Sequence, residues 1–227
     1  RLYVNGQRTF IKGTCLHHDP GALGAARNAT AWVSRLNPLR QMGCNAIRTS
    51  HNPPAPELLD LCDRMGFLVM DDLTDTWTIP KKENGYARLF DEWADKDLKA
   101  MIHRDRNHPS VIIWSIGNET GEQGYPEKYG IAYHLTEVCH NEDSTRLTSF
   151  GSDNPWASGQ DFRNTMDIYG FNYKPHLYGK FHAANPGKPF LGSETASTVS
   201  SRGVYIFPPS DKEDGLSPIT ICRCRQT

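Results

Sequence analysis

The sequence predicts an α/β fold, and within that class a (β/α)8 or TIM barrel that is apparently incomplete. Short apolar segments alternate with segments of helical periodicity, which is the order expected of a parallel sheet built from βα units. About seven strands can be counted in 227 residues, a length close to the roughly 250 residues of a complete barrel. Polar side chains follow the apolar segments, and in such barrels the chemistry lies at the carboxyl ends of the strands.

The predicted strands are short runs rich in β-branched, aromatic and other apolar residues. They cover residues 9–17, 45–50, 67–72, 110–116, 146–151, 166–172 and 189–194. An eighth strand is missing or replaced, so we expect the sheet to keep two open edges and the chain alone to be a poor enzyme. The segment ITIC at residues 219–222 alternates isoleucine with threonine, but it is short for the missing strand.

Helical patterns separate these strands. The segment PELLDLCDRMG opens on Pro56, repeats apolar residues at helical spacing and stops at Gly66, a residue favoured at helix C-termini. Residues 126–141 form another predicted helix, and because proline costs helix interiors about 3 kcal/mol, a helix should start or bend at Pro38. One further helix gathers its apolar side chains on one face, namely Phe90, Trp93, Ala94, Leu98, Met101 and Ile102.

Composition excludes several functional classes. The formal net charge is −1 with both signs mixed, so no basic surface for nucleic acid or an anionic membrane is expected. The longest apolar runs are far shorter than the roughly 20 residues that span a bilayer. Six cysteines do not form a dense disulfide framework, and we expect Cys15, Cys44 and Cys62, which lie in or beside apolar stretches, to pack as free thiols. Compartment and oligomeric state are left open.

Polar residues at the predicted strand ends indicate the chemistry. They are His17, Arg48 to His51, Asp71, Asp72, Asn118, Glu119, Tyr173 and Glu194. Two glutamates from separate strands at one barrel mouth are what glycoside hydrolysis needs, since one carboxylic acid protonates the leaving oxygen and the second carboxylate attacks the sugar. A single glutamate here could instead cap a helix or pair with a cation, but two in corresponding positions favour catalysis.

Four segments of the sequence carry a specific resemblance to a known family. They are GTCLHHD, GCNAIRTSHNPPAPELLDLCDRMGFLVMDD, RDRNHPSVIIWSIGNETG and PFLGSETAS. Together they closely resemble the catalytic domain of glycoside hydrolase family 2, and its β-galactosidases in particular. The resemblance covers residues 1–209, which we interpret as one partial barrel domain, whereas residues 210–227 form a divergent tail that is either a natural short end or a frame-shifted terminus.

The resemblance implies roles for the residues at the strand ends. Glu119 corresponds to the acid/base of a retaining exo-β-glycosidase and Glu194 to its nucleophile. Arg48 would hold the charge of Glu194, and Tyr173 would donate a hydrogen bond to it. Asn118 corresponds to the residue that binds the sugar 2-hydroxyl.

Two histidines complete the predicted site. His17 and His51 resemble ligands of sugar hydroxyl groups, and of the adjacent His17 and His18 only one can face the mouth, because neighbouring residues of a strand point to opposite faces. The alternatives remain an ordinary ion pair for Arg48, a packed ring for Tyr173, a turn residue for Asn118 and structural histidines.

Two departures from the family limit the prediction. The third strand ends in Asp71-Asp72 where the family usually has Asp-Glu, which leaves the contacts made there open. The segment LTDTWTIP after it lacks the glutamate and histidine pattern with which some members bind magnesium, so we expect no metal and no cofactor. The predicted substrate is a β-D-galactoside, with a β-glucuronidase or a catalytically incompetent fragment as the alternatives.

Overall fold

The apolar segments form the strands of one curved sheet. The computed structural model describes residues 2–26, 28–196 and 222–223. Seven of its strands are parallel, each hydrogen-bonded to the next in chain order. They are β3 (Lys12–His17), β4 (Ala46–Ser50), β5 (Leu68–Asp72), β6 (Val111–Asn118), β7 (Leu147–Ser152), β8 (Ile168–Asn172) and β9 (Phe190–Glu194). The prediction of an incomplete TIM barrel is confirmed.

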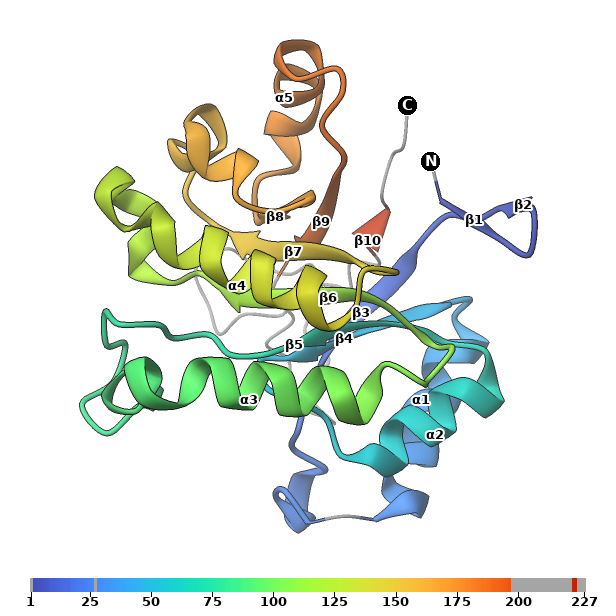
Figure 1. The fold of residues 1–227 in the computed structure, drawn as a ribbon. Helices are drawn as coiled ribbons and strands as arrows, with labels where there is room; N and C mark the ends of the chain where they lie inside the picture. Colours follow the sequence, from blue (N-terminus) through green and yellow to red (C-terminus); the bar gives the residue numbers. More distant parts are fainter. Residues whose placement is uncertain (1, 27, 197–221, 224–227) are drawn as a thin grey trace, which may run out of the picture.

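Helices cover the outside of this sheet. They are α1 (Ala29–Gln41), α2 (Pro56–Met65), α3 (Phe90–Asp105), α4 (Tyr129–Glu142) and α5 (Tyr178–Ala184). Figure 1 shows α3 and α4 side by side in front of the strands. Short 3-10 helices lie in the loops at Gly21–Leu23, Tyr86–Arg88, Gly121–Gly124, Pro126–Lys128, Ala157–Gly159, Asp161–Asn164 and Pro175–Leu177. Each helix buries an apolar face against the strands, as the alternating sequence pattern requires.

Two helical predictions need correction. Helical spacing predicts Trp93 on the buried face of α3, but it is 42% exposed and its ring packs under the ammonium of Lys96, 4.5 Å from the ring centroid. Pro38 does not start a helix, because α1 begins at Ala29, capped by the side chain of Asn28, and contains Pro38. Pro38 stands near the last turn, where few hydrogen bonds of the helix remain to be disrupted.

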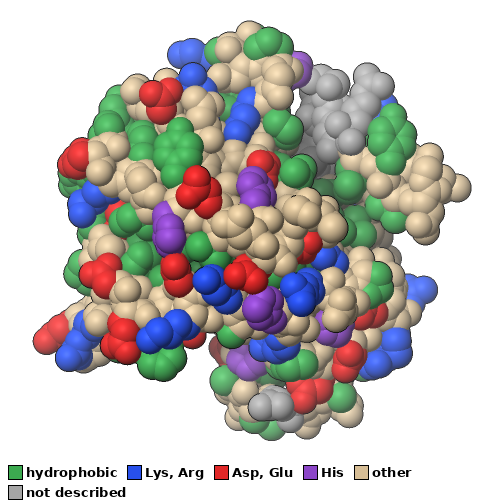
Figure 2. Space-filling view, viewed as in Figure 1, with side chains coloured by type: hydrophobic (Ala, Val, Ile, Leu, Met, Phe, Trp, Pro, Cys, Tyr) green, Lys and Arg blue, Asp and Glu red, His purple; other side chains and the backbone are tan. Residues whose placement is uncertain are grey.

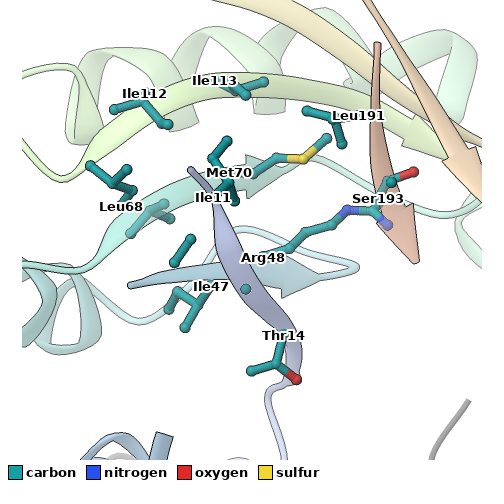
Figure 3. Close-up of a pocket in the computed structure, with 14 residues that line it drawn as sticks. Ile11, Thr14, Ile47, Arg48, Leu68, Met70, Ile112, Ile113, Leu191 and Ser193 are labelled. Carbon is teal, nitrogen blue, oxygen red and sulfur yellow. The ribbon is translucent and has the colours of Figure 1, made fainter. Parts of the chain in front are cut away.

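The barrel interior changes from apolar to polar along each strand. Residues of one strand alternate in direction, so Leu68, Met70 and Asp72 of β5 point the same way. Met70 packs with Ile113 of β6 and Leu191 of β9 around a cavity of about 40 Å³. Figure 3 shows these side chains and, beyond them, Arg48 extending from β4 toward β9. The apolar half of the interior is therefore a packed base beneath the polar strand ends.

The eighth position of the barrel differs from the other seven. Within the described residues β10 (Cys222–Arg223) pairs antiparallel with β3, with Cys222 opposite Gly13. No described strand links β3 to β9 by a parallel ladder. The other residues of the ITIC segment and the expected domain boundary at residue 209 lie outside the described residues. A small hairpin, β1 (Tyr3–Val4) and β2 (Gln7–Arg8), precedes the first barrel strand.

The outer surface is polar and mixed in charge. Figure 2 shows acidic and basic side chains interspersed on the face that carries α3 and α4. Among the described residues no helix combines the length and the apolar character that a membrane crossing needs. Among the described residues no disulfide joins Cys15, Cys44, Cys62 and Cys139, and the last three are buried.

Candidate active site

Glu194, the last residue of β9, is surrounded by hydrogen-bond donors. Its Oε1 accepts from Arg48 Nη1 at 2.9 Å, and its Oε2 accepts from the hydroxyl of Tyr173. The ring Nε2 of His51 lies 3.3 Å from the same Oε1. The contacts predicted from Arg48 and Tyr173 are thus present, and they fix the direction of the Glu194 carboxyl group.

Arg48 is buried and shared between two acids. Its Nη2 lies 2.9 Å from Asp72 Oδ2, while Nη1 faces Glu194. Burial would lower the pKa of Arg48, but Asp72 and Glu194 outweigh this effect and raise its pKa above the usual value. The guanidinium therefore stays charged and fixes the direction of Glu194.

Asp72 makes the contacts that the sequence left open at the Asp71-Asp72 end of the third strand. Its carboxylate reaches both Arg48 and His51, with 2.8 Å between Asp72 Oδ2 and His51 Nδ1. Asp71, which was predicted at the barrel mouth, instead lies on the opposite face of β5 and accepts a hydrogen bond from Thr49. Burial and the nearby carboxyl group of Asp105 on α3 raise the pKa of Asp71. Alternation along the strand explains why only one of the two acids faces the site.

Glu119 has different surroundings. It follows the last residue of β6 in a left-handed conformation with φ of 47°, and its N–H donates to the Gly151 carbonyl at 2.8 Å. Its Oε1 accepts from Asn172 Nδ2 at 2.7 Å. Burial raises the pKa of Glu119; the amide of Asn172 lowers it, and the charges of Asp153 and Glu194 raise it again, with a net rise. Glu119 is therefore the carboxyl group of the pair that is suited to carry a proton.

The backbone at Tyr173 repeats the conformation found at Glu119. Tyr173 follows the last residue of β8 with φ of 56°, and its N–H donates to the carbonyl of Glu194 at 2.7 Å. Left-handed backbone is uncommon for residues other than glycine and asparagine, and it gathers at functional sites. Register shifts precede both turns, beside Asn118 in β6 and beside Asn172 in β8. These irregularities direct the side chains at the strand ends toward the mouth.

Asn118 links the two halves of the site. Its Oδ1 accepts from Arg48 Nη2 at 3.1 Å and from Asn172 Nδ2 at 2.9 Å. Its Nδ2 lies 3.3 Å from His51 Nε2. A Cβ atom on Gly151 of the adjacent strand would collide with Asn118 Oδ1 and would lie 2.9 Å from Arg48 Nη2. The absence of a side chain at Gly151 is therefore what lets this network close.

The adjacent histidines point in opposite directions, as predicted. The rings of His17 and His51 meet edge to face with centroids 5.5 Å apart. His18 turns to the outside, where Nε2 contacts the Ala25 carbonyl and the ring lies beside Trp32 of α1. Burial and the neighbouring His51 lower the pKa of His17, which favours the neutral ring. A neutral imidazole can both donate to and accept from a hydroxyl group.

Three residues of the site were not predicted from sequence. Asn172 holds both Asn118 and Glu119, Ser193 Oγ donates to Asn172 Oδ1 at 2.6 Å, and Lys81 Nζ lies 3.1 Å from the carbonyl oxygen of Asn118. Asn172 and Ser193 stand at strand ends, so the rule that identified Glu119 could have found them. Lys81 belongs to a loop, and no sequence signal placed it here.

The described residues also contain one cluster with metal-ligating atoms. Asp60, Asp63 and His108 bring ligand atoms within 4.8 Å of one another. They lie on α2 and in the loop before β6, at the opposite end of that strand from Asn118. Asp63 already accepts from the Ser110 amide and pairs with His108 at 2.7 Å. These bonds explain the cluster as an anchor for the loop.

The fold and these side chains define a TIM-barrel domain with a pair of carboxyl groups at the carboxyl ends of its strands. The family model for the glycosyl hydrolases family 2 TIM barrel domain matches residues 1–209. The chain belongs to this family.

Known proteins and structures agree with this assignment. The chain is 42% identical to Beta-galactosidase BoGH2A of Bacteroides ovatus, an alignment that covers 90% of the chain and 28% of that protein. It is 28% identical to Beta-glucuronidase of Mus musculus, over 92% of the chain and 34% of that protein. A β-glycosidase structure from Bacteroides vulgatus superimposes with a TM-score of 0.78 at 42% identity, covering 88% of this chain and 25% of that one. The chain thus spans about a third or less of these relatives.

Proposed function

We propose that this chain supplies the catalytic barrel of a retaining exo-β-glycosidase that hydrolyses terminal non-reducing β-D-galactosides. The observation that carries the proposal is the contrast between two carboxyl groups at one barrel end. Glu194 is held by Arg48 and Tyr173, whereas Glu119 is held by the neutral amide of Asn172. A retaining mechanism needs this division between an ionised nucleophile and a protonated acid.

The proposed reaction has two displacements. Glu194 attacks the anomeric carbon while Glu119 gives its proton to the glycosidic oxygen, so the bond to the aglycone breaks and a glycosyl ester forms. Glu119, now a carboxylate, then takes a proton from water, whose oxygen attacks the anomeric carbon and releases Glu194. Arg48 and Tyr173 hold Glu194 on its line of attack.

The remaining predicted residues would bind the sugar. In this proposal Asn118 binds the 2-hydroxyl group, an interaction that strengthens in the transition state. His17 and His51 bind further hydroxyl groups, and their edge-to-face contact places them on the same side of the mouth. The substrate itself is a carbohydrate, with no cofactor required for either step.

Neutral ligands support a galactoside over a glucuronide. Among the described residues two cations that contact the site are engaged with carboxylates, because Arg48 pairs with Asp72 and Glu194, and Lys81 pairs with Asp75 at 3.5 Å. The relative at 42% identity is named a β-galactosidase. The second candidate is a β-glucuronidase, which the name of the mouse relative favours.

Side-by-side kinetics test the substrate. The full natural protein that contains this chain is assayed on chromogenic β-galactoside, β-glucuronide and β-mannoside, with the highest kcat/KM expected on the galactoside. A preference for the glucuronide overturns that assignment, and no turnover of any of them favours an incompetent barrel. Proton NMR of the first product decides the mechanism, since release of the β-anomer supports retention. A crystal structure should place the two carboxyl groups roughly 5 to 5.5 Å apart.

A further inference from the structure

The loop after β5 is fastened to the loop that carries Glu119. Trp77 Nε1 donates to the Ile116 carbonyl at 3.0 Å. The buried carboxylate of Glu122 accepts from the amide of Ile79 at 2.6 Å and from the hydroxyl of Thr78 at 2.7 Å. Three consecutive residues are therefore tied to β6 and to the turn that follows it, which leaves this loop little freedom.

This attachment brings Lys81 to the turn before Glu119. Lys81 Nζ lies 3.1 Å from the carbonyl oxygen of Asn118 and 3.5 Å from Asp75 Oδ2. That carbonyl belongs to the peptide unit that precedes Glu119, where φ is 47°. The side chain of Lys81 is about a third exposed, so it remains partly accessible to solvent.

We propose that Lys81 is a positioning residue for Glu119, which fixes the Asn118–Glu119 peptide in its left-handed turn and places a positive charge beside the acid/base. This inference rests on the proposed role of Glu119. Lys81 acts through Glu119 and needs no contact of its own with the sugar.

Lys81 is one of several groups around Glu119 that change the pKa of its carboxyl group. Asp153 after β7 and Glu194 on β9 are both negative and both raise the pKa of Glu119, in addition to burial. Asn172 on β8 is neutral, and its hydrogen bond lowers the pKa, as does the charge of Lys81. Without Lys81 the proton would be held more tightly and would leave at higher pH. Glu119 would then be a weaker acid toward the departing oxygen.

Three variants of the full natural protein test the inference. In Lys81→Met the basic limb of the pH profile of kcat/KM should move to higher pH on a galactoside with a poor leaving group. Lys81→Arg keeps the charge and should keep the limb near its original place. Lys82→Met removes the same charge one residue further on, at an exposed position, and should leave the profile unchanged. An unmoved limb in Lys81→Met, or an equal movement in Lys82→Met, overturns the inference.

A parallel variant separates this result from the proposed function. Glu119→Ala should lose activity on poor leaving groups. On an activated aryl galactoside, which forms the glycosyl ester without the acid, its turnover should rise when azide is added, because a small anion can attack the ester without a base. If Glu119→Ala behaves in this way and Lys81→Met does not shift the limb, Lys81 alone is wrongly assigned. If Glu119→Ala leaves the poor substrate unaffected, the role of Glu119 itself is wrong.

Discussion

The two glutamates lie at corresponding places in the barrel, but the groups around them differ in charge. Glu194 ends β9 and receives hydrogen bonds from a guanidinium and a phenol. Glu119 follows β6 and receives one from the amide of Asn172, with Asp153 and Glu194 as nearby negative charges. The position along the strand is therefore shared, whereas the hydrogen-bond donors and charges around each carboxyl group come from other strands. A motif that contains glutamate specifies the place, and the neighbours specify the role.

Removing Glu194 should produce the largest loss. Glu194→Ala takes away the group that forms the ester, and we expect kcat to fall on the order of 10⁵- to 10⁶-fold, the scale found for catalytic nucleophiles. Activated and poor leaving groups should suffer alike, because no ester forms from either. Glu137→Ala, at an exposed position of α4, is the matched control. Residual turnover above about a hundredth of normal would contradict the assignment.

Removing Glu119 should instead lower the rate by an amount that depends on the leaving group of the substrate. In Glu119→Ala, hydrolysis of poor leaving groups should fall roughly 10²- to 10⁴-fold, the usual contribution of a general acid. The first step on an activated aryl galactoside should be nearly unaffected. The raised pKa of Glu119 means that the acid form persists to higher pH than in an ordinary carboxyl group, so the wild-type rate should fall only as pH rises through that value. This basic limb should vanish in the variant, and its persistence would argue against Glu119.

Arg48→Met should remove the cation that distinguishes the surroundings of Glu194 from those of Glu119, and it should also lower the stability of the barrel. Asp72 is fully buried and Glu194 is 11% exposed in its side chain, so both would lose their buried cation. Breaking such a pair costs about 3–5 kcal/mol, which calorimetry of the full natural protein can measure as a lower transition temperature of the barrel. Arg48→Lys keeps the charge but lacks the planar guanidinium, so its transition temperature should lie between those of Arg48→Met and the wild type. Equal transition temperatures for Arg48→Met and wild type would show that the ion pairs contribute nothing.

The sequence predicted the strands well because their signal is local. Each barrel strand is a short apolar run, and its end is marked by the first polar residues, as at Asn118 and Glu194. The alternation of strand residues also separated His17 from His18 correctly. The position of Asp71 at a strand end predicts that it lies at the mouth, but the same alternation turns it toward Thr49 and α3.

Features that depend on distant contacts could not be read from the sequence. Lys81 reaches Asn118 only because Trp77 and Glu122 fasten its loop to β6. The left-handed turn at Tyr173 depends on a bond to the backbone of Glu194 on the next strand. Each relation joins residues far apart in the chain, and no periodicity records it.

Gly151→Ala should disturb both carboxyl groups at once, by a smaller amount. The added methyl group would meet Asn118 Oδ1 and lie 3.1 Å from Asn172 Oδ1, so the network that joins the two sites must shift. Overpacking of this kind costs about 1–3 kcal/mol. Gly159→Ala, where a Cβ atom meets nothing within 4 Å, is the control. Thermal unfolding and KM measured together check the prediction, and a neutral effect on both would contradict it.

The smallest expected effect is a shift in the pH profile on substitution of Ser193, which acts through Asn172 on Glu119. Ser193 Oγ donates to Asn172 Oδ1 at 2.6 Å, which directs the amide nitrogen of Asn172 toward Glu119. In Ser193→Ala one hydrogen bond worth about 0.5–1.5 kcal/mol is lost and the amide can rotate. The hydrogen bond from Asn172 lowers the pKa of Glu119, so weakening it should move the basic limb to higher pH.

The matched control for Ser193 is another buried serine of the barrel. Ser149 on β7 is fully buried, and its hydroxyl has no hydrogen-bond partner among the described residues. Ser149→Ala removes the same oxygen without releasing an amide, so its pH profile should match the wild type. If both serine variants shift the limb equally, the shift reflects general loosening of the barrel. If only Ser193→Ala shifts it, the orientation of one neutral amide contributes to the difference between the two glutamates.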